Sequence, residues 1–162
     1  MNRLRPFAAA LLALLAIFAF APSASAASIN LGPSLAQLTN IRVGAHPDYD
    51  RIVFDLTALP ATENARYVAQ LVHDPSGAPV SLPGNAFLQV TMTGTAAHDD
   101  NGNLTYPGPD TFTTPQLTNV RAVALIGDFE GYVNVGLGLR HSAGIHVFTL
   151  TGPNRLVVDV NH

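Results

Sequence analysis

The feature that most constrains the fold is a period of two in the positions of apolar side chains. Between residues 51 and 56 the chain reads Arg-Ile-Val-Phe-Asp-Leu, and such alternation places successive side chains on opposite faces of a strand. Clusters of Gly, Pro, Asn and Asp, which favour turns, separate runs of this kind. The runs lie at residues 41–43, 51–56, 67–73, 87–93, 117–126, 132–140, 145–151 and 155–160. This pattern predicts an all-β fold, an antiparallel β-sandwich of about eight short strands.

The N-terminus has the three parts of a secretory signal peptide. Two arginines near the start precede an apolar run over residues 7–20, and small residues follow at 24–26. We predict a signal peptide over residues 1–26, cleaved after Ala26 or one residue later, and one mature domain over residues 27–162. Because the apolar run is shorter than the about 20 residues that span a bilayer, we expect no stable membrane span after cleavage. The predicted location is therefore extracytoplasmic.

Composition excludes several classes of function. The chain has no cysteine and no lysine, so it can form neither a disulfide framework nor a phosphate-binding loop that needs lysine. It also lacks the Gly-x-Ser-x-Gly motif of many hydrolases. In the predicted mature domain six arginines face eleven carboxylates, a net charge of −5, which argues against nucleic acid and anionic lipid as partners. We predict a non-catalytic protein without a cofactor.

Residues 94–116 differ from the rest of the chain. They are dense in Gly, Pro, Asn, Asp and Thr, and loops longer than about 12–15 residues are uncommon in compact domains. The segment is either a mobile or meandering cover or a binding lid. The second interpretation rests on Tyr106 and Phe112, whose rings could offer flat faces to a sugar.

The runs over residues 41–43 and 51–56 are predicted to form a hairpin, because the Pro- and Asp-rich segment 46–50 between them favours a turn. One candidate binding cluster lies around this hairpin. His46 and Asp50 flank a turn, and Arg51 opens the strand that follows. Arginine can hold a carboxylate with two parallel hydrogen bonds. The partner is either internal, Asp50 or Asp159, or external, in which case Arg51 or Arg155 meets an acidic wall polymer or a peptide carboxylate.

A second candidate is the carboxylate pair Asp128 and Glu130. Two positions apart on a strand, the pair would share a face about 6.5 Å apart along the chain, near the separation that inverting glycosidases use. Both residues lie between Gly127 and Gly131, however, a spacing that predicts a turn with solvated carboxylates. Ligand or cation binding is the alternative to catalysis for this pair.

Histidines and aromatic residues add weaker signals. His141 and His146 flank a tight connection, but no third ligand is evident nearby, so we predict no metal site. The remaining large aromatic residues are expected in the core or at its rim: Tyr49, Phe54, Phe87, Phe129, Tyr132 and Phe148.

Several motifs, in order, resemble the AMIN-like domain of secreted actinobacterial proteins, a relative of the AMIN domain of cell-wall amidases. They are Arg42-Val43-Gly44-Ala45-His46 with Tyr49-Asp50-Arg51-Ile52-Val53-Phe54, then Asp74-Pro75-Ser76-Gly77-Ala78-Pro79-Val80, Gly127-Asp128-Phe129-Glu130-Gly131, Gly136-Leu137-Gly138-Leu139 and Pro153-Asn154-Arg155-Leu156-Val157-Val158-Asp159-Val160. The resemblance implies a β-sandwich in the cell envelope and carries over no catalytic residues.

We therefore expect a secreted binding or targeting module that engages peptidoglycan, another wall polymer or an envelope protein. Its candidate ligand-binding residues are His46, Asp50, Arg51, Tyr106, Asp128, Glu130 and Arg155. One alternative is a structural domain that pairs with other proteins through an exposed edge strand, with a homodimer as one form. The other is a glycan hydrolase that uses Asp128 and Glu130.

Overall fold

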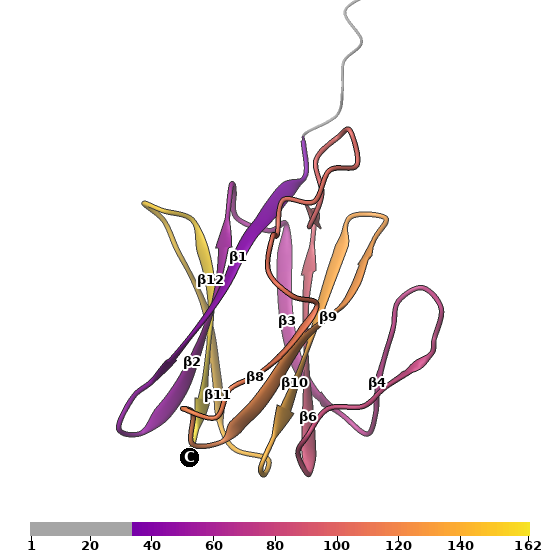
Figure 1. Cartoon of the computed structure of the whole chain (residues 1–162). Helices are drawn as coiled ribbons and strands as arrows, with labels where there is room; N and C mark the ends of the chain where they lie inside the picture. Colours follow the sequence, from indigo (N-terminus) through magenta and orange to yellow (C-terminus); the bar gives the residue numbers. More distant parts are fainter. Residues whose placement is uncertain (1–33) are drawn as a thin grey trace, which may run out of the picture. The chain divides into compact units, whose positions relative to one another are not determined.

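The computed structural model describes residues 34–162, which form strands and no helix (Figure 1). The strands are β1 (Ala36–Ala45), β2 (Tyr49–Leu56), β3 (Thr62–Val68), β4 (Leu71–Val72), β5 (Pro79–Val80), β6 (Ala86–Thr93), β7 (Thr95–Ala96), β8 (Thr111–Thr113), β9 (Val120–Phe129), β10 (Tyr132–Leu139), β11 (Ile145–Leu150) and β12 (Arg155–Asn161). Within these residues there is no helix that could span a membrane. The predicted signal peptide, residues 1–26, lies outside the described residues.

The first sheet has the strand order β11-β12-β2-β1-β7. Its neighbours pair antiparallel, except that β1 and β7 are parallel. The predicted hairpin of β1 and β2 is confirmed. On β2 every second residue from Asp50 to Leu56 is buried, and the residues between them are half-buried. The period of two in the sequence thus arises because alternate side chains point to the inner and the outer face of this sheet.

The second sheet has the order β3-β6-β10-β9-β8 and faces the first across the main core (Figure 1). Leu38 and Phe54 from the first sheet pack in one cluster with Leu88, Met92 and Leu137 from the second. All five side chains are fully buried. The prediction of an antiparallel all-β sandwich is confirmed.

The β4–β5 hairpin and its flanks form a third layer over the outer face of the second sheet. Leu71 and Leu82 pack there against Ala122, Ala124 and Ile126 of β9. They also lie over two glycines of β10, at positions 136 and 138. Seven consecutive residues of β10 are consequently buried, which removes the alternation that a strand with one wet face shows.

Residues 94–116 are part of the sandwich. They contribute β7 to one sheet and β8 to the other. Tyr106 is only 4% exposed and belongs to the main core. Its hydroxyl donates a hydrogen bond to the carbonyl of Pro109 at 3.1 Å, and burial raises the pKa of this phenol. The ring therefore has no free face for a sugar.

Some predicted boundaries are wrong. The strand predicted over 67–73 is divided between β3 and β4, and β3 begins as early as Thr62. The turn predicted over 127–131 is wrong because β9 continues to Phe129 and leaves only Glu130 and Gly131 outside the strands. Both of these residues have positive φ, 48° and 78°, as in the two-residue type I′ turn that matches the twist of a hairpin.

Candidate functional site

Asp50, a candidate ligand-binding residue, is a structural tie between the two sheets. Its carboxylate is fully buried and accepts backbone N–H groups of Thr118 at 3.0 Å, Asn119 at 2.6 Å and Val120 at 2.8 Å. His162 Nε2 lies 3.2 Å from the same carboxylate. Because Asp50 is on β2 and Val120 begins β9, these bonds connect one sheet to the other.

Those donors stabilise the ionised form of the Asp50 carboxyl. Burial alone would raise the pKa of this carboxyl, but the hydrogen bonds from Val120, Thr118 and Asn119, together with the contact to His162, leave it lowered below 3.8. A buried anion is stable when several donors satisfy its oxygens. Asp50 therefore faces its own protein and has no exposed surface for a ligand.

Arg51 has an internal partner, and of the two carboxylates considered it is Asp159. Arg51 Nε and the NH2 nitrogen each lie 2.7 Å from an oxygen of Asp159, so the pair is bidentate. These hydrogen bonds raise the pKa of Arg51. Its guanidinium carbon also lies 5.1 Å from the ring centre of Tyr49 and 5.5 Å from that of Phe148, within the range of cation–π contact.

A row of flat side chains, which we call the outer-face ladder, crosses the outer face of the first sheet. It consists of His46, Tyr49, Arg51, Phe148 and His146. The rings of His46 and Tyr49 stack with centroids 4.5 Å apart and planes 19° apart. The rings of His146 and Phe148 stack at 4.9 Å and 29°. Arg51 lies between the two stacked pairs and joins them.

The strand register explains why these residues meet. Arg51 pairs with Asp159, which pairs with His146 on the next strand. One step along, Val53 pairs with Val157, which pairs with Phe148. Residues that are paired or two apart share a face, so β2 and β11 direct Tyr49, Arg51, His146 and Phe148 to the same side. Tyr49 and Phe148 were expected in the core or at its rim, although their i, i+2 spacing from Arg51 and His146 was a usable signal for a shared outer face.

Arg155 lies on the same outer face, one row further along. It pairs with Asp55 in register, but the carboxylate of Asp55 is held by Arg42 at 2.6 and 2.7 Å. Arg155 donates to the carbonyl of Pro153 at 3.2 Å and has no ion pair within residues 34–162. The face thus carries Arg42, Arg51 and Arg155 against two carboxylates, an excess of one positive charge.

Asp128 belongs to the second sheet, whereas Glu130 lies outside it in the turn between β9 and β10. Asp128 is on β9, where it accepts the backbone N–H of Ala97 at 3.0 Å and contacts His98 Nδ1 at 2.6 Å. Glu130 is in the turn, with φ of 48°. The strand geometry on which the 6.5 Å separation depended is therefore absent from this pair.

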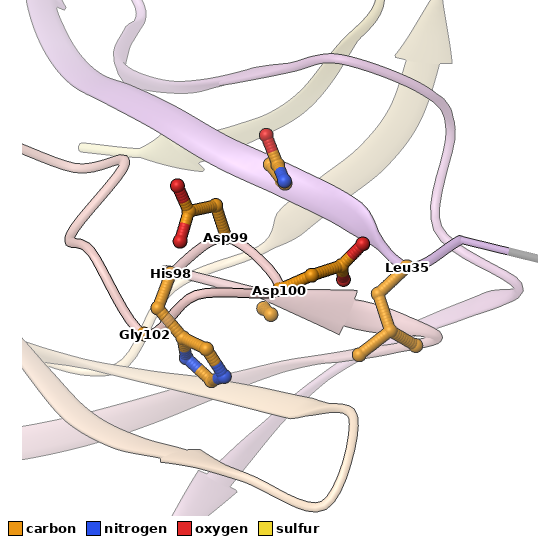
Figure 2. Close-up of a pocket in the computed structure, with 7 residues that line it drawn as sticks. Leu35, His98, Asp99, Asp100 and Gly102 are labelled. Atoms are coloured by element: carbon orange, nitrogen blue, oxygen red, sulfur yellow. The ribbon is translucent and has the colours of Figure 1, made fainter.

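A cavity of about 280 Å³ lies near His98 (Figure 2). Figure 2 shows His98, Asp99 and Asp100 around it, with Leu35 at one side. The Asp99 carboxylate accepts N–H groups of Asn101 and Asn103, and the bonds from Asn103 are the main reason that its pKa is lowered. Within residues 34–162 no three His, Asp or Glu side chains are grouped so that they could hold a metal ion.

Comparison with known families adds one finding. A sequence profile of the AMIN-like domain matches residues 36–162, which is the whole of the two-sheet sandwich from β1 onward. The chain belongs to the AMIN-like domain family. Membership associates the chain with cell-envelope proteins and with non-catalytic binding or targeting modules as a class. Searches of curated proteins and of solved structures gave no match.

Proposed function

We propose that this AMIN-like domain is exported by the signal peptide over residues 1–26 and binds peptidoglycan through the outer face of its first sheet. The observation that carries the proposal is the outer-face ladder, five flat side chains in successive contact from the β1–β2 turn across β2 to β11. No catalytic step is included, because Asp128 is held by Ala97 and His98 and Glu130 lies in a turn.

The ladder supports binding of a glycan strand. Flat aromatic faces pack against the apolar face of a sugar ring, and a few polar groups at such a site fix its orientation. Stacking on both sides and the ion pair with Asp159 hold Arg51 in place. Because these side chains are ordered before a ligand arrives, less conformational entropy is lost on binding.

Arg155 supports recognition of the peptide part of the wall polymer. Its charge has no carboxylate partner within residues 34–162, since Asp55 is held by Arg42. The stem peptides of peptidoglycan carry free carboxylates, and a guanidinium can bind a carboxylate through two hydrogen bonds. Although the predicted mature domain is acidic overall, this face has an excess of positive charge, which favours an acidic ligand here.

The test is co-sedimentation of the exported protein with purified cell-wall sacculi at low salt. Tyr49→Ala and Phe148→Ala should each weaken binding about three- to tenfold, the effect of losing one aromatic contact. Arg155→Gln should weaken binding and reduce its dependence on salt.

The matched control is Tyr132→Ala, because Tyr132 is 48% exposed and lies on β10 in the other sheet. This variant should bind sacculi as the unsubstituted protein does. The proposal fails if the unsubstituted protein does not sediment with sacculi, or if Tyr132→Ala weakens binding as much as Tyr49→Ala.

A further inference from the structure

The strand β11 is an unprotected edge of the first sheet. It ends the order β11-β12-β2-β1-β7 and reads Ile-His-Val-Phe-Thr-Leu, with no proline and no Lys, Arg, Asp or Glu. The other sheet edges are protected, because β7 and β8 have only two and three residues and β3 carries Glu63 and Arg66. Proteins usually shield edge strands by shortness or charge, and β11 has neither protection.

The alternation of hydrogen-bonded and non-hydrogen-bonded pairs between β11 and β12 shows which backbone groups of β11 face outward. Asn161 donates its N–H to the carbonyl of Gly144 at 2.9 Å, and this pair continues the register of β11 with β12. In an antiparallel ladder the hydrogen-bonded pairs recur at every second residue. His146, Phe148 and Leu150 therefore bond to β12, whereas Ile145, Val147 and Thr149 direct their N–H and C=O groups away from the sheet.

We propose that β11 pairs antiparallel with β11 of a second copy of this chain, with Val147 on the two-fold axis. In that register Val147 faces Val147 of the second copy, and Ile145 faces Thr149 of the second copy. The three outward N–H and three outward C=O groups of each strand then find partners. An identical strand fits because β11 has no Lys, Arg, Asp or Glu, so the two-fold axis brings no such charges together.

The outer face also favours a second copy over an unrelated peptide. Pairing about Val147 places His146 opposite Phe148 of the second copy, at a non-hydrogen-bonded position where side chains are closest. His146 and Phe148 already stack within one strand at 4.9 Å, so the contact continues the same stacking across the axis. Leu150 falls opposite Gly144 of the second copy, which leaves room for the leucine side chain.

The pairing deepens the proposed function, on which its biological role rests. The two first sheets become one continuous ten-stranded sheet, and the two outer-face ladders lie end to end on one face. A glycan strand is itself a repeating ligand, so two joined ladders raise its apparent affinity through avidity without any new contact.

The test measures self-association of the exported protein by sedimentation equilibrium. Val147→Lys and Val147→Glu, each alone, should weaken dimerisation at least about tenfold because like charges meet at the axis. An equimolar mixture of the two should restore a dimer that contains one copy of each. Val147→Thr, which keeps the N–H group and the branched side chain, should dimerise as the unsubstituted protein does.

Thr149→Pro provides a second variant in case the charged substitutions prevent folding, which circular dichroism would show. Proline is tolerated where the N–H faces away from the sheet, so this variant should fold and be monomeric. A monomeric unsubstituted protein at every accessible concentration overturns the inference. So does undiminished dimerisation of the Val147→Lys and Thr149→Pro variants.

Separate readouts keep the two proposals apart. Tyr49→Ala should bind sacculi about three- to tenfold more weakly but remain a dimer, whereas Thr149→Pro should be monomeric and still bind sacculi with lower avidity. Failure of dimerisation with normal wall binding removes only the edge pairing. Dimerisation without any wall binding removes only the proposed function.

Discussion

Replacing Asp50 with asparagine should destabilise the domain more than any other substitution of similar size on β2. The carboxylate accepts three backbone N–H groups from the segment that leads into β9, and its exposed fraction is zero. Asparagine keeps the volume but has one acceptor oxygen. That oxygen can serve Asn119 and Val120, which leaves the side-chain amide facing the N–H of Thr118 and one buried donor without a partner.

The magnitude follows from the bonds that change. One charge-assisted hydrogen bond is lost, two become bonds to a neutral acceptor, and a buried N–H is left unsatisfied, at about 1–3 kcal/mol for the last alone. We expect Asp50→Asn to lower the free energy of unfolding by about 2–4 kcal/mol at neutral pH, a large share of the roughly 5–15 kcal/mol typical of a domain. The melting temperature should fall by about 10 °C.

The loss of unfolding free energy caused by Asp50→Asn should depend on pH. Because the folded-state pKa of Asp50 is lowered from 3.8, its ionised form contributes stability above that value, and the contribution is lost as the pH falls through the folded pKa. The unsubstituted protein should therefore lose stability below about pH 4. Asp50→Asn has no such titration, so the gap between the two proteins should narrow in acid.

Urea denaturation at pH 7 and in a series down to pH 3 measures this gap. Asp48→Asn is the control, because Asp48 lies in the turn just before β2 and is exposed. A loss of stability below about 1 kcal/mol for Asp50→Asn, or a gap that stays constant across the pH series, would refute the idea that Asp50 ties the sheets together.

Two other substitutions test the glycine positions and the hairpin turn. Gly138→Ala would place a methyl group against the backbone carbonyl of Pro83, so we expect a loss of about 2–3 kcal/mol by urea denaturation. Gly136→Ala would meet only the flexible end of Leu71, 2.7 Å away, and should cost less; equal losses would contradict the difference between the two contacts. Glu130→Gly relieves a positive φ of 48° and should raise stability by about 1 kcal/mol, whereas a decrease would show that Glu130 makes a contact that matters.

The fold class could be predicted from the sequence because most strands have one buried and one solvent-exposed face, which produces an alternating pattern of apolar and polar residues. On β2 the alternation is strict, and the hairpin with β1 followed from it. The exceptions have physical causes. The third layer buries β10 on both faces through contacts with Leu71 and Leu82, which are distant in sequence. The segment around Tyr106 joins both sheets through short pairings that composition does not reveal.

The candidate site was predicted only in part, because tertiary pairing decides which polar residues are free. Arg51 and Asp159 were named together as one option, and their bidentate pair is present. Asp50 is the neighbour of Arg51 in sequence and carries a carboxylate as Asp159 does. Strand alternation nevertheless directs the Asp50 side chain inward, toward β9. The outer-face ladder joins strands that lie about one hundred residues apart. Their pairing register cannot be predicted from the local sequence of either strand.

The most direct test of the proposed binding face is a set of backbone amide spectra of the protein, titrated with soluble muropeptides. Our account predicts that the largest shifts fall on Tyr49 and Arg51 of β2, on His146 and Phe148 of β11, and on Arg155. Shifts confined to β3, β6 and β10, or no shifts at saturating muropeptide, would contradict it.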